Sequence, residues 1–291
     1  MKKIKKISLW LIGILCSLYF LLCVTLYFFQ EKLIFFPTKL EKKYVFDFEQ
    51  KFQEILIPTQ DSMHLHGVLF HSKKTKKSSD STKTDKKLVF YLHGNAGTVA
   101  RWAEIADVYT NLGYDLFVLD YRGYGKSDGK IESQKQFFDD VRTAYNFVRK
   151  NKKYEQKNIV IVGYSVGTAS AAMLASQNNP KALILQAPYF SLTDMTTRFY
   201  PFVPTFLLKY EFNTAEFLAK NKTPTTIFHG TKDKVIPYQS SILIKEYLEK
   251  KKIENNLKNK VIDFDFVTLF HQGHGNIHRN PVFLNRLKDI L

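Results

Sequence analysis

The chain has 291 residues, 45% of them hydrophobic, so its length and composition fit one large globular domain and leave little room for a second. The formal net charge of +16 is that of a lysine-rich surface, and no stretch carries a DNA- or RNA-reading motif, so we expect no nucleic-acid partner. Only Cys16 and Cys23 are present, both in an apolar N-terminal stretch, which excludes a disulfide framework and a cysteine-based active site in the rest of the chain.

An uncharged run, Ile7–Phe29, follows four lysines at the N-terminus. As a helix it would be about 35 Å long, enough to cross a hydrocarbon core of about 30 Å. It is too long for the core of a typical signal peptide, and no small-residue cleavage site follows it. We therefore predict that residues 1–30 form a retained single-pass signal anchor, with a cleaved signal peptide as the alternative. The leading lysines predict a cytoplasmic N-terminus and an extracytoplasmic domain.

Residues 52–58 and 64–71 are predicted strands joined by a turn. Residues 72–87, SKKTKKSSDSTKTDKK, are nearly free of apolar side chains and are expected to form an exposed loop. Beyond it, short apolar runs alternate with helical patterns. Strands are predicted at 88–92, 115–119, 158–162, 182–185, 225–228 and 262–269, and helices at 99–111, 131–150, 166–176, 238–250 and from 281 onward. This alternation predicts a mostly parallel sheet with helices on both faces, within a domain covering residues 31–291.

Residues 188–222 interrupt the alternation with many aromatic side chains and two prolines, Pro201 and Pro204. Core helices seldom hold so many aromatic residues beside two prolines, so we expect a small cap over the active site. The candidate substrate contacts are aromatic residues of this cap together with one residue beside the predicted nucleophile: Tyr164, Tyr189, Phe190, Phe199, Phe202 and Phe206.

The pentapeptide at 163–167, Gly-Tyr-Ser-Val-Gly, matches the G-x-S-x-G pattern of a nucleophile elbow. A β-rich run precedes it and an alanine-rich helical segment follows, which is the strand–turn–helix context that an elbow needs. We therefore predict that Ser165 is the nucleophile. The segment His93-Gly94-Asn95-Ala96-Gly97 also follows an apolar strand. It is the expected oxyanion loop, and the backbone amides of Asn95 and Val166 are the expected oxyanion donors.

Asp233 follows the first strand after the cap, at the carboxyl end where a parallel sheet places its functional loops. It is the predicted acid that orients the catalytic base, and Asp194 is the competing candidate. His274, between two glycines after the last strand, is the predicted base, and His271 is its competitor. The chain order Ser165, Asp233, His274 is the order of α/β-hydrolases.

The histidines suggest two further predictions. His271, His274 and His278 could share one helical face as metal ligands, but glycines on both sides of His274 argue against a helix, so no metal site is expected. His64 and His66 fall on one face of a predicted strand and are expected to form a surface pair.

Several stretches resemble the BEM46-type, ABHD-like branch of the α/β-hydrolases. They are FFQEKLIFFP (28–37), YLHGNAG (91–97), LDYRGYGKSDG (119–129), GYSVGTAS (163–170), HGTKDKVIP (229–237) and GHGN (273–276). The resemblance covers nearly the whole chain after about residue 25, and the loop at 72–87 departs from it. It implies a triad of Ser165, Asp233 and His274 and an oxyanion loop at His93–Asn95. Members of the branch include lipases, acyl-protein thioesterases and peptidases.

The expected function is that of a membrane-anchored serine hydrolase. It would cleave carboxylic esters or thioesters of acyl-chain or lysolipid-like substrates through an acyl-enzyme, without a cofactor. One alternative is a serine peptidase of the same fold. A second is a non-catalytic membrane scaffold, against which the presence of all three triad residues argues.

Overall fold

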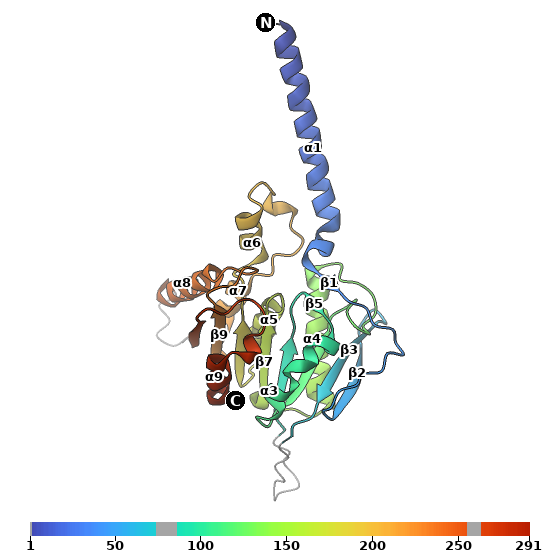
Figure 1. Cartoon of the computed structure of the whole chain (residues 1–291), viewed down its shortest axis with the longest axis vertical. Helices are drawn as coiled ribbons and strands as arrows, with labels where there is room; N and C mark the ends of the chain where they lie inside the picture. Colours follow the sequence, from blue (N-terminus) through green and yellow to red (C-terminus); the bar gives the residue numbers. More distant parts are fainter. Residues whose placement is uncertain (1, 74–85, 255–262) are drawn as a thin grey trace, which may run out of the picture.

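The computed structural model describes residues 2–73, 86–254 and 263–291. Most of the exposed loop expected at 72–87 therefore lies outside the described residues, as does the beginning of the strand expected at 262–269. A long N-terminal helix stands on a compact body in which helices surround a central sheet (Figure 1).

The central sheet contains eight strands within the described residues, in the order β10-β9-β8-β7-β4-β6-β3-β2. These strands are β2 (Phe52–Pro58), β3 (His64–Phe70), β4 (Leu88–Leu92), β6 (Asp115–Asp120), β7 (Ile159–Tyr164), β8 (Ala182–Gln186), β9 (Thr225–Gly230) and β10 (Phe264–Leu269). β3 pairs antiparallel with β2 and with β6, and the other pairings are parallel. The expected mostly parallel sheet is thus confirmed, and its parallel strands all end at one edge.

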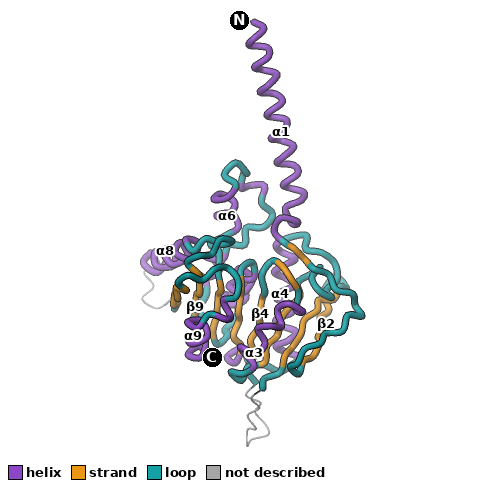
Figure 2. The backbone as a smooth tube through the Cα atoms, in the orientation of Figure 1, coloured by secondary structure: helices purple, strands orange, loops and turns teal. Residues whose placement is uncertain are grey.

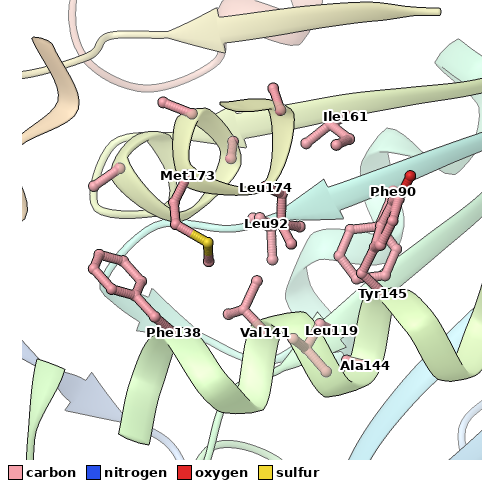
Figure 3. Close-up of a cluster of buried hydrophobic side chains, with 14 of the residues drawn as sticks. Phe90, Leu92, Leu119, Phe138, Val141, Ala144, Tyr145, Ile161, Met173 and Leu174 are labelled. Atoms are coloured by element: carbon pink, nitrogen blue, oxygen red, sulfur yellow. The ribbon is translucent and has the colours of Figure 1, made fainter. Parts of the chain in front are cut away.

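Hydrophobic cores cover both faces of the sheet. One face packs against α4 (Gln134–Asn151), α5 (Gly167–Gln177) and α8 (Gln239–Glu254). Val141 of α4 and Leu174 of α5 lie in this core beside Phe90 and Leu92 of β4 (Figure 3). The other face packs against α9 (Pro281–Ile290) and a helical segment at 99–110. Two covered faces explain why the inner strands are apolar throughout rather than alternating.

The helix expected at 99–111 is broken into three short pieces. They are α2 (Val99–Trp102), a 3₁₀ turn at Ala103–Ile105, and α3 (Ala106–Thr110). The indole N–H of Trp102 donates to the Ala96 carbonyl at 3.1 Å, which ties the end of α2 back to the preceding loop. The apolar spacing showed which face is buried, but it could not show this contact with the loop just before the helix.

The expected surface pair of histidines is wrong for His66. His64 is exposed, whereas His66 is fully buried, with ring nitrogens 2.8 Å from Asp120 and 3.1 Å from Glu54. The ring of Phe46, from the chain before β2, stacks on it at 5.6 Å. A residue outside the strand pair therefore buries a position that alternation alone would leave at the surface.

The N-terminal helix α1 (Lys2–Ile34) is long and apolar enough to cross a membrane. A helix of this kind serves either as a membrane anchor or as a signal sequence. Directly after it, β1 (Phe36–Pro37) pairs in parallel with β5 (Ala96–Gly97), so the end of the helix is joined to the segment expected to form the oxyanion loop.

The segment expected to form a cap contains α6 (Leu192–Phe199), a 3₁₀ turn at Thr205–Leu207 and α7 (Thr214–Lys220). Its outer part lies beside α1, above the body of the domain (Figure 2). The hydroxyl of Tyr19 donates to the Phe202 carbonyl at 2.8 Å, and the Gln30 side chain donates to the Leu207 carbonyl at 3.2 Å.

Candidate active site

Ser165 lies at the sharp turn between β7 and α5, with a left-handed backbone φ of 53°. Its N–H donates to the Gln186 carbonyl at 2.9 Å, which holds this strained conformation in place. Steric crowding leaves no room for a side chain at Gly163 or Gly167, on either side of Ser165. A Cβ at Gly163 would come within 2.6 Å of the Ala171 Cβ, and one at Gly167 would collide with the Leu92 carbonyl oxygen. The turn therefore needs glycine at both positions of the pentapeptide.

His274 comes from the loop after β10 and reaches across to the turn. Its Nε2 lies 3.1 Å from the Ser165 hydroxyl oxygen. The Tyr164 hydroxyl donates to the backbone carbonyl of His274 at 2.8 Å, and the two rings are 5.1 Å apart. Tyr164 thus fixes the backbone that carries the imidazole, which is a role that sequence reasoning did not give it.

Asp233, in the loop after β9, holds the other side of the imidazole. Its Oδ2 lies 2.7 Å from His274 Nδ1, while its Oδ1 accepts hydrogen bonds from the N–H groups of Val235 and Ile236 at 2.8 and 2.9 Å. The carboxylate is completely buried. Burial opposes its ionisation, but hydrogen bonds from His229, His274 and the backbone outweigh this and hold the pKa of Asp233 below its usual range.

His229 is a neighbour of this carboxylate that sequence reasoning missed. Its Nε2 lies 3.4 Å from Asp233 Oδ2 and 2.9 Å from the Ile236 carbonyl, and its Nδ1 lies 2.6 Å from the Ser241 hydroxyl. The ring is fully buried and rigidly held. The stretch HGTKDKVIP contained the signal, since His229 precedes Asp233 by four residues in it.

The competing candidates lie elsewhere. The Asp194 carboxylate is in the first turn of α6 and pairs with Arg198 at 2.9 Å. His271 is exposed, and its backbone N–H donates to the Thr231 hydroxyl at 2.9 Å. The structure therefore brings Ser165, His274 and Asp233 into one hydrogen-bonded row, in which neither Asp194 nor His271 takes part.

The loop expected to bind the oxyanion is held in place by hydrogen bonds to its backbone carbonyl groups. The Tyr121 hydroxyl donates to the His93 carbonyl and the Tyr124 hydroxyl to the Asn95 carbonyl, both at 2.8 Å. The N–H of Phe36 also donates to the Asn95 carbonyl, at 2.9 Å. The two tyrosines were not singled out from the sequence, although both belong to the LDYRGYGKSDG stretch.

The two amides expected to bind the oxyanion have no acceptor within the described part of the chain: neither the N–H of Asn95 nor that of Val166 is hydrogen-bonded there. The His93 side chain is not available to a substrate. Its ring is fully buried, with Nδ1 2.7 Å from the Gly94 carbonyl, and burial lowers the pKa of this imidazole. The loop therefore offers backbone groups rather than side chains.

The aromatic candidates for substrate contact separate into buried and exposed groups. Tyr189 is buried, and its hydroxyl donates to the Val166 carbonyl at 3.2 Å, which braces the turn beside Ser165. Phe190 is half-buried and packs on Tyr247, with ring centroids 5.4 Å apart. Tyr164, described above, is also buried, whereas three residues on the outer part of the expected cap are exposed: Phe199, Phe202 and Phe206.

Comparison with known proteins agrees with this architecture. Residues 83–213 match the family described as "Serine aminopeptidase, S33". The chain is 30% identical over 209 residues to an uncharacterized protein of Mycobacterium tuberculosis, covering 72% of this chain and 71% of the relative. It is 27% identical over 205 residues to the protein bem46 of Schizosaccharomyces pombe, covering 68% and 66%.

Among solved structures, the Pyrococcus furiosus esterase Pf2001 superposes with a TM-score of 0.63 at 18% identity, covering 89% of this chain and 96% of the esterase. A likeness at this identity concerns the fold. Together with the sequence relatives and with the geometry described above, it identifies the chain as a member of the BEM46-like α/β-hydrolases.

Proposed function

We propose that the protein is a membrane-anchored serine hydrolase that cleaves carboxylic esters or thioesters. The observation that carries this proposal is the row formed by Ser165, His274 and Asp233, with heavy-atom distances of 3.1 and 2.7 Å. A serine hydroxyl is a weak nucleophile until an adjacent base takes its proton. A strained turn that exposes the hydroxyl to an imidazole, itself held by a buried carboxylate, meets that requirement.

In the first half of the proposed reaction, the Ser165 oxygen attacks the carbonyl carbon of the substrate while its proton moves to Nε2 of His274. The negative charge that develops on the carbonyl oxygen is stabilised by the N–H groups of Asn95 and Val166. Asp233 stays ionised and stabilises the imidazolium. The tetrahedral intermediate then collapses, and the alcohol or thiol leaves with the proton from His274.

In the second half, water attacks the acyl group on Ser165 and His274 takes the proton from that water. The same two amides stabilise the second tetrahedral intermediate. Its collapse releases the carboxylic acid, and the proton returns from His274 to the serine oxygen. Every proton step uses the same imidazole, so the 2.7 Å contact between Asp233 and Nδ1 supports both halves by fixing one tautomer.

Acyl chains and lysolipids are the proposed substrates, because the cap is aromatic and lies beside the apolar helix α1. Peptide hydrolysis is a second candidate, favoured by the description of the matching family as a serine aminopeptidase. The two can be separated by comparing initial rates on medium-chain nitrophenyl esters and acyl thioesters with rates on aminoacyl nitroanilides. Faster turnover of the nitroanilides would favour the peptidase.

The assignment of the nucleophile is tested by ester turnover of Ser165→Ala. We expect a loss of at least about a thousandfold in turnover, because members of a triad act as a unit. Ser176→Ala is a matched control on α5, the helix that follows Ser165, where the hydroxyl donates to the Met173 carbonyl at 2.8 Å. A folded Ser165→Ala protein that kept more than a tenth of the activity would refute the nucleophile.

We also propose that α1 is retained as an anchor and that the domain faces away from the cytoplasm, because lysines precede the apolar run. Protease added outside intact cells or spheroplasts should then digest the domain. Protection of the domain until the cells are lysed would reverse the proposed orientation, and release of the domain into the medium would replace the anchor by a cleaved signal.

A further inference from the structure

The outer part of the cap carries an unusual apolar surface. Residues 199–208, FYPFVPTFLL, contain no charged side chain and are bounded by Arg198 and Lys209; we call this segment the cap tip. Its four large aromatic side chains are all exposed: Phe199 (48%), Tyr200 (57%), Phe202 (55%) and Phe206 (84%). Contiguous apolar patches of this kind on a protein surface mark a site of contact with another molecule or with a membrane.

The position of the cap tip along α1 indicates what it contacts. Its backbone is joined to the helix at two levels, through Tyr19 to Phe202 and through Gln30 to Leu207. At the helix, residues 3–22 are all exposed, whereas Cys23, Val24 and Leu26 are partly covered. The cap tip therefore lies beside the last third of the uncharged run, rather than below its end (Figure 1).

The length of the helix then places the cap tip relative to a bilayer. The part of the uncharged run before Cys23, residues 7–22, would be about 24 Å long as a helix. A hydrocarbon core is about 30 Å thick. If α1 crosses a membrane, its embedded part must extend past Leu22, to the level at which the cap tip covers it. The cap tip is then at or inside the membrane surface.

Part of the backbone of the cap tip is already bonded within the protein. Unpaired peptide groups are costly in hydrocarbon because no water is present to bond them. Pro201 and Pro204 have no N–H group, and the carbonyls of Phe202 and Leu207 are bonded by side chains of α1. The charged neighbours are themselves paired. Arg198 contacts Asp194 at 2.9 Å, and Lys209 contacts Glu31 at 3.2 Å.

We propose that the cap tip inserts into the near leaflet of the bilayer beside α1, with its aromatic side chains among the lipid glycerol and upper acyl groups. Aromatic residues favour this zone of a membrane. The inference rests on the membrane anchor of the proposed function and extends it. The cap of the hydrolase would touch the lipid from which an acyl substrate is drawn, so the enzyme would meet its substrate without releasing it into water.

The test places an environment-sensitive fluorophore, NBD, on single cysteines of the full-length protein in phosphatidylcholine liposomes. Phe206→Cys, in a background where Cys16 and Cys23 are serine, reports on the cap tip. Leu56→Cys in the same background is the matched control, because Leu56 is 56% exposed on β2 of the body. A third protein that keeps only the native Cys16 reports on the anchor itself.

We expect NBD at position 206 to emit at shorter wavelength than at position 56. We also expect nitroxide-labelled lipids to quench it about twofold, as for an element buried about 5–10 Å in the interface. Quenching at Cys16 without quenching at 206 would overturn the insertion and leave the anchor intact. Emission at 206 that changed with protein density but was not quenched by lipid would also overturn it, in favour of a second copy on the cap tip.

Absence of quenching at Cys16 would remove the anchor and with it the insertion. This outcome is distinguishable from failure of the hydrolase, because reaction of Ser165 with a fluorophosphonate probe is measured separately on the same protein.

Discussion

The site around Ser165 and the cap tip are built in opposite ways. At the site, packing and hydrogen bonds fix the key groups: Asp233 accepts hydrogen bonds from two backbone N–H groups, and the turn at Ser165 has no space for a side chain at Gly163 or Gly167. At the cap tip, large aromatic side chains are exposed, and the segment is tied to the rest of the protein mainly through α1. The first region depends on the packing of the sheet, whereas the second depends on the helix beside it.

Mutations should therefore have different effects in the two regions. A conservative change at the site should reduce activity strongly without unfolding the protein, because the neighbours that hold the site remain. The same substitution in the expected cap or on an exposed loop should have little effect on turnover. Pairs of identical substitutions, one at the site and one in these exposed segments, test this contrast.

The largest effect is expected for the imidazole. His274→Asn removes the imidazole that we propose as the carrier of every proton, and we expect ester turnover to fall by at least about a thousandfold. His271→Asn is the matched control, because His271 is exposed and has φ of 59°, a conformation that asparagine tolerates. Steady-state turnover of both purified variants checks the expectation. Equal losses in the two would contradict the assigned base.

The next effect separates the two candidate acids. Asp233→Asn can keep its bonds to the backbone amides but loses the charge that fixes the tautomer of His274, so we expect at least about a hundredfold loss in turnover. Asp194→Asn breaks only an exposed pair with Arg198 and should cost less than about tenfold. The ratio of the two turnover numbers is the readout, and a larger loss at Asp194 would show the acid to be in the cap.

A smaller effect is expected where the end of α1 meets the expected oxyanion loop. Phe36→Pro removes the N–H that bonds the Asn95 carbonyl, and a hydrogen bond of about 1 kcal/mol corresponds to roughly a fivefold loss in turnover. Phe36→Ala keeps that N–H and removes only a half-exposed ring, so it is the control. The loss should appear in kcat and not in KM. Identical kinetics for the two variants would mean that this contact does not support the loop.

The smallest effect concerns stability at acid pH. Because the folded protein holds the pKa of Asp233 below its usual range, the ionised carboxylate stabilises the fold above the unfolded value of about 4, and this stabilisation is lost as the pH falls below it. Denaturant unfolding between pH 6 and pH 3 should show a steeper loss for the wild type than for Asp233→Asn. Parallel curves would contradict the depressed pKa.

Much of the fold could be predicted from local signals. Apolar runs bounded by turns predicted the parallel strands, and the glycines around Ser165 indicated a tight turn. The structure shows why glycine is needed there, since a Cβ at Gly167 would collide with the Leu92 carbonyl oxygen. The meeting of Ser165, Asp233 and His274 could be expected because each follows a strand whose carboxyl end lies at the same edge of the sheet.

The rest depended on contacts between distant segments. His66 is buried by Phe46, which lies outside the strand pair and precedes the sheet in sequence. Tyr121 and Tyr124 follow β6, and only the fold brings them to the carbonyls of the expected oxyanion loop. No periodicity or spacing in the sequence encodes which of these side chains will meet.

Labelling of the full-length protein in membranes with a fluorophosphonate probe, followed by mass spectrometry of the modified peptide, tests the serine hydrolase itself. The probe should form one adduct, on Ser165, whose hydroxyl has an imidazole at 3.1 Å backed by a buried carboxylate. The Ser241 hydroxyl also lies beside an imidazole, 2.6 Å from His229 Nδ1, but Ser241 is fully buried, so we expect no adduct there. The adduct should be absent from Ser165→Ala and form much more slowly on His274→Asn. An adduct on another residue, or ester hydrolysis by folded protein in which Ser165 is not labelled, would contradict the mechanism.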